Sequence, residues 1–122
     1  MYCLINEIRQ IFEENEVDGD PPITDAEISS IITDVDTEID AALCRRYITP
    51  FSSVPQLIST ISRLKSTAET MRRIYMEANG ALIKPEVMNH YRNEGNRLME
   101  DLRTGRLEIT GSRRLQMSAT TL

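Results

Sequence analysis

Apolar residues recur at helical spacing in four separate stretches of the chain, and this periodicity limits the fold more than any other feature. Residues three and four apart share one face of a helix, so each stretch predicts a helix with one buried side. The expected helices cover about residues 4–15, 24–47, 54–78 and 85–104. The sequence therefore predicts an all-α fold: a small bundle of about four helices within residues 1–105, followed by an extended C-terminal tail, residues 106–122.

Local signals agree with these boundaries. Thr24 and Glu27 are spaced as a capping box, in which each side chain satisfies a free backbone N–H of the first turn. Pro50 ends the second helix, because the residue before a proline avoids helical geometry. Pro85 suits the first position of the last helix, and Gly105 suits the left-handed conformation that stops it.

Composition indicates one soluble globular domain. The 122 residues are 40% hydrophobic and 27% charged, which is too apolar for a disordered chain. The longest uncharged run, residues 47–62, contains two prolines, so we expect no membrane span. Glu7 interrupts the N-terminal apolar residues, so we expect no signal peptide, and Cys3 and Cys44 are expected to be reduced thiols.

The charge is divided unevenly along the chain. Residues 1–47 contain three arginines and twelve acidic residues, a net charge of −9, whereas residues 48–122 contain eleven basic and seven acidic residues, a net charge of +4. The overall charge of −5 argues against a protein that holds nucleic acid by bulk phosphate neutralisation. The division itself has two interpretations: solvated faces of one bundle, or complementary surfaces of neighbouring subunits.

Catalytic and metal-binding patterns are weak. His90 is the only histidine, and Glu94, an acid one helical turn away from it, is expected to make a surface contact with it. The run from Glu16 to Glu27 has acids at several positions of a calcium loop, but Pro21 occupies the position where a glycine makes the turn. No glycine-rich phosphate loop occurs. We therefore expect no enzyme activity, no metal and no cofactor.

The second expected helix is unusually acidic. Two pairs of acids, Asp34 with Glu38 and Asp36 with Asp40, are four residues apart, where like charges repel. Such a helix either tolerates the repulsion on a solvated face or has its charge compensated by cations of another element or another chain. The candidate acidic face, lining a DNA channel or a subunit contact, comprises Asp18, Asp20, Asp34, Asp36, Glu38 and Asp40. The candidate basic face, directed at an adjacent chain, comprises Arg63, Lys65, Arg72 and Arg73.

Residues 106–122 have no helical period, and Leu107 and Ile109 alternate with charged residues. This segment is either a disordered terminus or a tail that becomes ordered on binding a partner. The candidate docking residues are Arg106, Leu107, Ile109, Arg113, Arg114, Leu115, Met117 and Leu122.

Several runs carry a family resemblance. The chain starts Met-Tyr-Cys, and an acidic loop precedes a helix that reads DVDTEID from Asp34. That helix leads into RYITPF from Arg46 and VPQLI from Val54, and YRNEGNRLMEDLRTG starts at Tyr91. Over about residues 1–111 the sequence resembles the small helical head–tail connector proteins of tailed bacteriophages, also called adaptor or head-completion proteins, closest to the branch of Mu-like phages.

The resemblance implies a structural protein of the virion neck, present in the host cytoplasm during assembly, without catalysis, cofactor or membrane. Such adaptors form a homo-oligomeric ring, commonly dodecameric, beneath the portal protein. They extend the channel for double-stranded DNA, which meets them only as the passing genome, and they present a surface to a downstream neck or tail protein, a stopper or terminator. The alternative from the residues alone is a small helical regulatory protein that binds a single protein partner.

Overall fold

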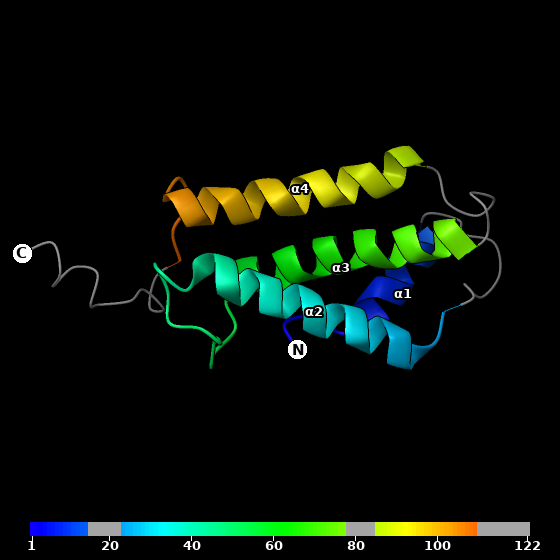
Figure 1. Cartoon of the computed structure of the whole chain (residues 1–122), viewed down its shortest axis with the longest axis horizontal. Helices are drawn as coiled ribbons and strands as arrows, with labels where there is room; N and C mark the ends of the chain where they lie inside the picture. The colour runs from blue at the N-terminus through cyan, green and yellow to red at the C-terminus, as the bar shows by residue number, and fades with distance from the viewer. Residues whose placement is uncertain (15–22, 78–84, 110–122) are drawn as a thin grey trace, which may run out of the picture.

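Four α-helices make up the part of the protein that the structure describes, as the sequence predicts. The computed structural model describes residues 1–14, 23–77 and 85–109. The helices are α1 (Ile5–Glu14), α2 (Asp25–Leu43), α3 (Gln56–Glu77) and α4 (Pro85–Thr104) (Figure 1). The described part contains no β-strand, so the predicted all-α class is confirmed.

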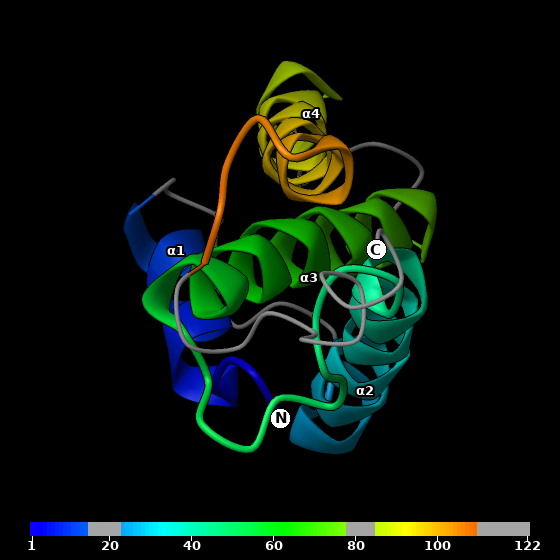
Figure 2. The same ribbon diagram turned by 90° about the vertical axis from the view of Figure 1, so that its left-hand side faces the viewer.

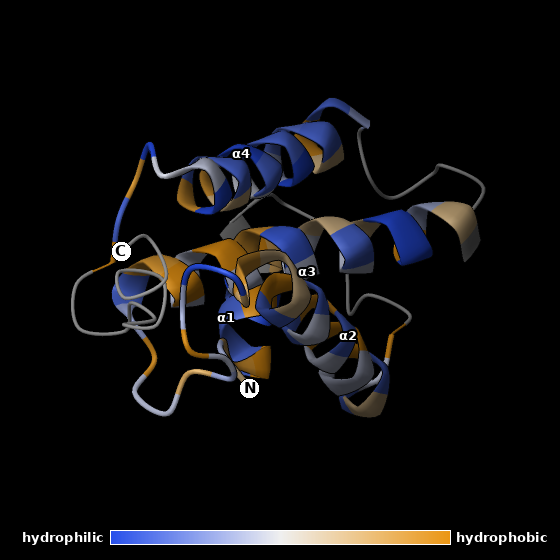
Figure 3. Cartoon of the chain, turned by 60° about the vertical axis from the view of Figure 1, so that its left-hand side comes forward, coloured by the Kyte–Doolittle hydropathy of each residue, from blue (hydrophilic) through white to orange (hydrophobic). Residues whose placement is uncertain are grey.

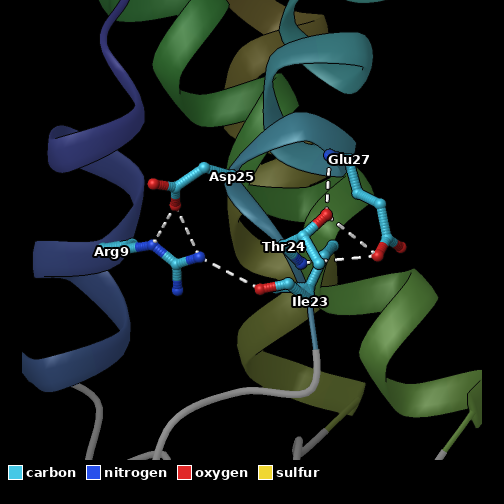
Figure 4. Close-up of polar contacts among 5 residues, drawn as sticks. All are labelled: Arg9, Ile23, Thr24, Asp25 and Glu27. Carbon is cyan, nitrogen blue, oxygen red and sulfur yellow. Dashed lines mark hydrogen bonds and ion pairs between the residues drawn. The ribbon is translucent and has the colours of Figure 1, made fainter.

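The start of α2 is fixed by two sets of polar contacts (Figure 4). The Oγ1 atom of Thr24 accepts a hydrogen bond from the Glu27 N–H at 3.1 Å, and the Glu27 carboxylate accepts one from the Thr24 N–H at 3.4 Å. This confirms the predicted capping box. From α1, Arg9 donates to the Asp25 carboxylate at 2.8 Å and to the Ile23 carbonyl at 3.0 Å, which fastens α1 to the start of α2.

The end of α2 differs from the prediction, because the helix stops at Leu43 and not near Tyr47. The N–H groups of Arg46 and Tyr47 both donate to the Leu43 carbonyl, each at 3.0 Å, and so form a tight turn in place of another helical turn. This turn directs the Tyr47 side chain into the core, where it is 1% exposed. The bounds of α4 are as predicted, and Gly105 has the expected positive φ, +89°.

Helix α3 lies in the middle of the molecule, with α1, α2 and α4 around it (Figure 2). A helix covered on several sides has little solvent-facing surface, so small side chains are needed where neighbours approach. Its fully or nearly fully buried positions include several small residues: Ser62, Ser66, Thr67, Ala68 and Thr70. The outermost helix, α4, packs mainly on α3, and most of its length is hydrophilic (Figure 3).

The contact between α3 and α4 depends on Gly95. A Cβ atom added at this position would lie 2.6 Å from Cγ of Lys65 and 3.4 Å from the Lys65 backbone nitrogen. Lys65 is itself held, because its Nζ atom contacts Glu38 of α2 at 2.9 Å and Asn96 of α4 at 2.5 Å. The absence of a side chain at Gly95 therefore lets α4 lie close to the stem of a fixed lysine.

Replacing Gly95 by valine should separate α4 from α3. We expect G95V to lower the free energy of unfolding by about 2 kcal/mol, because the added carbons overlap Lys65 by more than the helix can absorb. The matched control is N93V on the exposed face of the same helix, which should change it by less than about 0.5 kcal/mol. Urea unfolding of both variants measures the difference, and equal stabilities would contradict the role of Gly95.

The N-terminal segment folds back onto the turn between α2 and α3. The ring of Tyr2 packs edge-on against Phe51 with centroids 5.8 Å apart, and Tyr47 lies 6.2 Å from Phe51. Leu4, at the start of the helix expected over about residues 4–15, is 60% exposed. Leu4 precedes α1 and its carbonyl accepts from the Glu7 N–H, so its side chain lies off the helical stripe, while Tyr2 and Cys3 are buried.

The segment after α4 also packs on the bundle. The Leu107 N–H donates to the Asp101 carbonyl at 3.0 Å, and the Ile109 N–H donates to the Tyr47 hydroxyl at 3.1 Å. Arg46 lies over Gly105 and pairs with Glu108 at 3.5 Å. The prediction of a docking tail from Arg106 is thus wrong for Leu107 and Ile109. Leu107 packs against the core and Ile109 is only 8% exposed within it.

Candidate functional site

The predicted acidic face is divided by the fold. Asp34 is exposed on α2 and has no hydrogen bond or ion pair within residues 1–14, 23–77 and 85–109. The Glu38 side chain is 55% exposed and pairs with Lys65, and Asp40 accepts a hydrogen bond from the Tyr2 hydroxyl at 2.6 Å. Asp18 and Asp20 lie outside the described residues. Among the described members of this set, Asp34 is therefore the exposed acid without a partner in the chain.

Asp36 is buried, so its assignment to a DNA-facing or subunit-facing surface is wrong. Its Oδ2 atom accepts a hydrogen bond from the Tyr2 N–H at 2.7 Å, and Oδ1 accepts one from the Ser62 hydroxyl at 2.6 Å. The carboxylate thereby connects the N-terminal segment, α2 and α3. Burial raises the pKa of Asp36, and the hydrogen bonds from Ser62 and Tyr2 partly oppose that rise.

The Tyr2 hydroxyl extends the same network. It donates to Asp40 and accepts from the Phe51 N–H at 3.0 Å, so one side chain joins α2 to the turn before α3. Burial is the largest cause and the hydrogen bond to Asp40 the second largest of a shift that raises the pKa of Tyr2 to about 12. The hydroxyl therefore stays protonated at neutral pH and holds this junction as a neutral donor.

Removing the Asp36 carboxylate tests this junction. Asp36→Leu leaves the Tyr2 N–H and the Ser62 hydroxyl without their acceptor, and should lower the free energy of unfolding by about 2–4 kcal/mol. Asp36→Asn keeps the shape of the side chain and one acceptor oxygen for the Tyr2 N–H, and its NH2 group can donate to the Ser62 hydroxyl oxygen, so it should cost clearly less. Urea unfolding compares the two variants, and equal losses would contradict a hydrogen-bonding role.

The pH dependence gives a second readout. Because the folded-state pKa of Asp36 is raised, protonation favours the folded state, and that contribution is lost as pH rises through the raised pKa. The stability of the wild type relative to D36N should therefore fall as pH increases from below the ordinary aspartate range to neutrality. A relative stability that rises with pH would show that the carboxylate is preferentially charged in the fold.

The predicted basic face is largely paired within the chain. Arg63 lies 3.6 Å from Glu7 of α1, and Arg72 pairs with Glu69 of its own helix at 3.0 Å. Lys65 is only 8% exposed, so the prediction that it faces an adjacent chain is wrong. Its charge instead compensates Glu38, which is the intrachain alternative considered for the acidic helix. Arg73 lines a groove that also contains Asp34.

A cationic cleft was not predicted from the sequence. It has a volume of about 480 Å³ and is lined by Ala41, Ala42, Arg45, Arg46 and Arg103. Arg45 is exposed and has no hydrogen bond or ion pair among the described residues, whereas Arg46 pairs with Glu108 and Arg103 with Glu100. The adjacent arginines at the end of α2 were a visible signal, but Arg103 joins them only through the packing of α4.

The remaining candidate residues form no catalytic or metal-binding arrangement among the described residues. His90 is exposed and its ring lies 5.5 Å from that of Tyr91. The described residues hold no group of three or more side chains suited to a metal ion, and none of their helices is long and apolar enough to cross a membrane. Of the predicted docking residues, Arg106 is exposed, while Arg113, Arg114, Leu115, Met117 and Leu122 lie outside the described residues.

Taken together, the fold and these surfaces define a small all-α protein whose accessible features are charged patches and a C-terminal segment anchored on the bundle. The sequence matches the family described as Bacteriophage Mu, Gp36 over residues 2–121, so the chain belongs to that family and is a phage protein. No curated protein matches the sequence.

Proposed function

We propose that the protein is a structural subunit of the phage neck. In this role it forms a ring beneath the portal protein, extends the DNA channel and joins the portal to a downstream neck or tail protein. The family supports the phage context of the proposal. The resemblance to head–tail connectors is the reason for proposing the neck as the position in the virion.

The anchoring of residues 105–109 is the observation that carries the proposal. Arg46 and Tyr47 hold Glu108 and Ile109 at the end of the bundle where α2 and α4 finish. The chain continues from this fixed point into residues 110–122, which contain two arginines and no acidic residue. A basic segment with a fixed origin suits attachment to a second protein while the bundle keeps its own place in a ring.

The outer face of α2 is consistent with a wall for passing DNA. Within the helix, residues 25–43, there is no lysine or arginine, and Asp34 and Glu38 are exposed. Phosphates of a moving genome are repelled by the part of this face that carries Asp34 and Glu38, so the duplex can pass that part without being held. In this proposal, double-stranded DNA passes through the channel and is not bound as a ligand.

Truncation tests the attachment. A chain lacking residues 110–122 should keep its helical content and stability but lose co-purification with the portal protein of its own phage. The structure places the cut after Ile109, since a chain ending at Gly105 also loses the Tyr47 and Arg46 contacts and should be less stable. Circular dichroism, urea unfolding and pull-down with the portal give the three readouts.

Imaging of the intact neck, with the portal in place, tests the position in the virion. Density for a ring of this subunit below the portal is the expected result. If the chain truncated after Ile109 binds the portal as well as the full chain does, residues 110–122 are not the attachment segment, and the neck assignment is unaffected. Absence of the protein from purified virions, or a one-to-one complex with a non-virion protein, would refute the neck assignment.

A further inference from the structure

One stripe of α2 carries both a free acid and a free base. Asp34 and Arg45 are eleven residues apart, which is about three helical turns, so they lie on the same face. Arg45 follows the last helical residues, and Cys44 before it has helical angles (φ −62°, ψ −20°), so the stripe continues to Arg45. Both side chains are exposed and neither has a partner among the described residues.

The surface between these two charges permits close approach of another helix. Thr37 and Ala41, near the middle of the stripe, are small and exposed, and the longer side chain of Glu38, also near the middle, is held by its ion pair with Lys65 of α3. Thr37 donates to the Thr33 carbonyl, so its hydroxyl is already hydrogen-bonded within the helix. Short side chains at the centre and opposite charges at the two ends form a self-complementary pattern.

The cationic cleft strengthens the basic end of the stripe. Arg45 shares the cleft with Arg46 and Arg103, and no acidic side chain is among the residues that line it. At the other end, Asp34 lines a groove with Glu38 and Glu69, where Arg73 is the one basic lining residue. A carboxylate presented to the cleft would therefore meet guanidinium groups from the turn after α2 and from α4.

We propose that two copies of the free protein pair through α2 in antiparallel orientation, with Arg45 of each copy contacting Asp34 of the other. Because both charges lie on one face, a two-fold antiparallel contact pairs each Arg45 with the Asp34 of the other copy within a single interface, and such a contact is isologous. A closed ring needs head-to-tail contacts, so this dimer is a state of the free subunit outside the ring. The inference goes beyond the proposed neck function and stands without it.

Charge reversal is the direct test, read by sedimentation of the full chain over a concentration series without portal. D34R and R45D should each weaken dimerisation at least about tenfold, because each change places like charges together at two symmetric contacts. The double variant D34R/R45D should recover most of the affinity. Added salt should weaken the wild-type dimer, since the contacts are exposed.

A control variant and a cross-linking experiment locate the contact. E86R has the same charge change as D34R on an exposed position of α4 and should leave dimerisation unchanged. With Cys44 replaced by serine, A41C should be cross-linked between copies by a short bismaleimide, whereas N93C on the outer face of α4 should not. Circular dichroism of each variant verifies that the fold is intact.

Three results would overturn the proposal. The first is a wild-type protein that stays monomeric at every concentration, and the second is equal cross-linking of A41C and N93C. The third is a double variant that fails to recover while R45D loses affinity for a DNA duplex, which would make the cleft a phosphate site. A ring observed in the neck would not rescue the dimer, and a missing dimer would not exclude the ring.

Discussion

The placement of α3 between three other helices is the constraint on which the rest of the structure depends. The separation of two packed helices follows from the size of the side chains between them. Ser62, Ser66 and Thr70 are fully buried on α3, and short side chains of this kind let neighbouring helices approach it closely. The same residues bring hydroxyl groups into the interior, where polar atoms need partners. The packing of α3 therefore determines which polar contacts the neighbouring elements make.

Two buried charged side chains, Asp36 and Lys65, connect the outer elements to α3, each through its own polar contacts. Asp36 of α2 accepts hydrogen bonds from Ser62 and from the Tyr2 N–H, so a buried acid holds the N-terminal segment in place. Lys65 of α3 pairs with Glu38 and Asn96, so a buried base connects α2 to α4. Removing one partner from such a group leaves a buried charge or donor unsatisfied, which costs more than the contact itself contributes. These two sites therefore specify how the outer elements lie against α3.

The sequence was a good guide to features that depend on local spacing. The capping box at Thr24, the bounds of α4 and the positive φ of Gly105 follow from residues a few positions apart. The burial of Asp36 has a local signal in the sequence, because Asp36 falls on the apolar stripe of α2: Ile32, Asp36, Ile39 and Leu43. The burial of Ile109 had none, since its partner Tyr47 is 62 residues away.

Contacts between residues that are distant in the sequence also explain the surface charge. Because of these contacts, the acidic residues 1–47 and the basic residues 48–122 do not form one acidic and one basic surface. A tally along the chain counts every charge as available, but folding neutralises some of them internally. Asp36 and Lys65 are buried, and Arg63 and Arg72 pair with acids of the same chain. The exposed cationic cleft instead combines arginines from the acidic half of the sequence with Arg103 from the basic half. The charge of a surface thus depends on which helices and helix ends pack together there. A partner is expected to recognise these local surfaces and not the net charge of the chain.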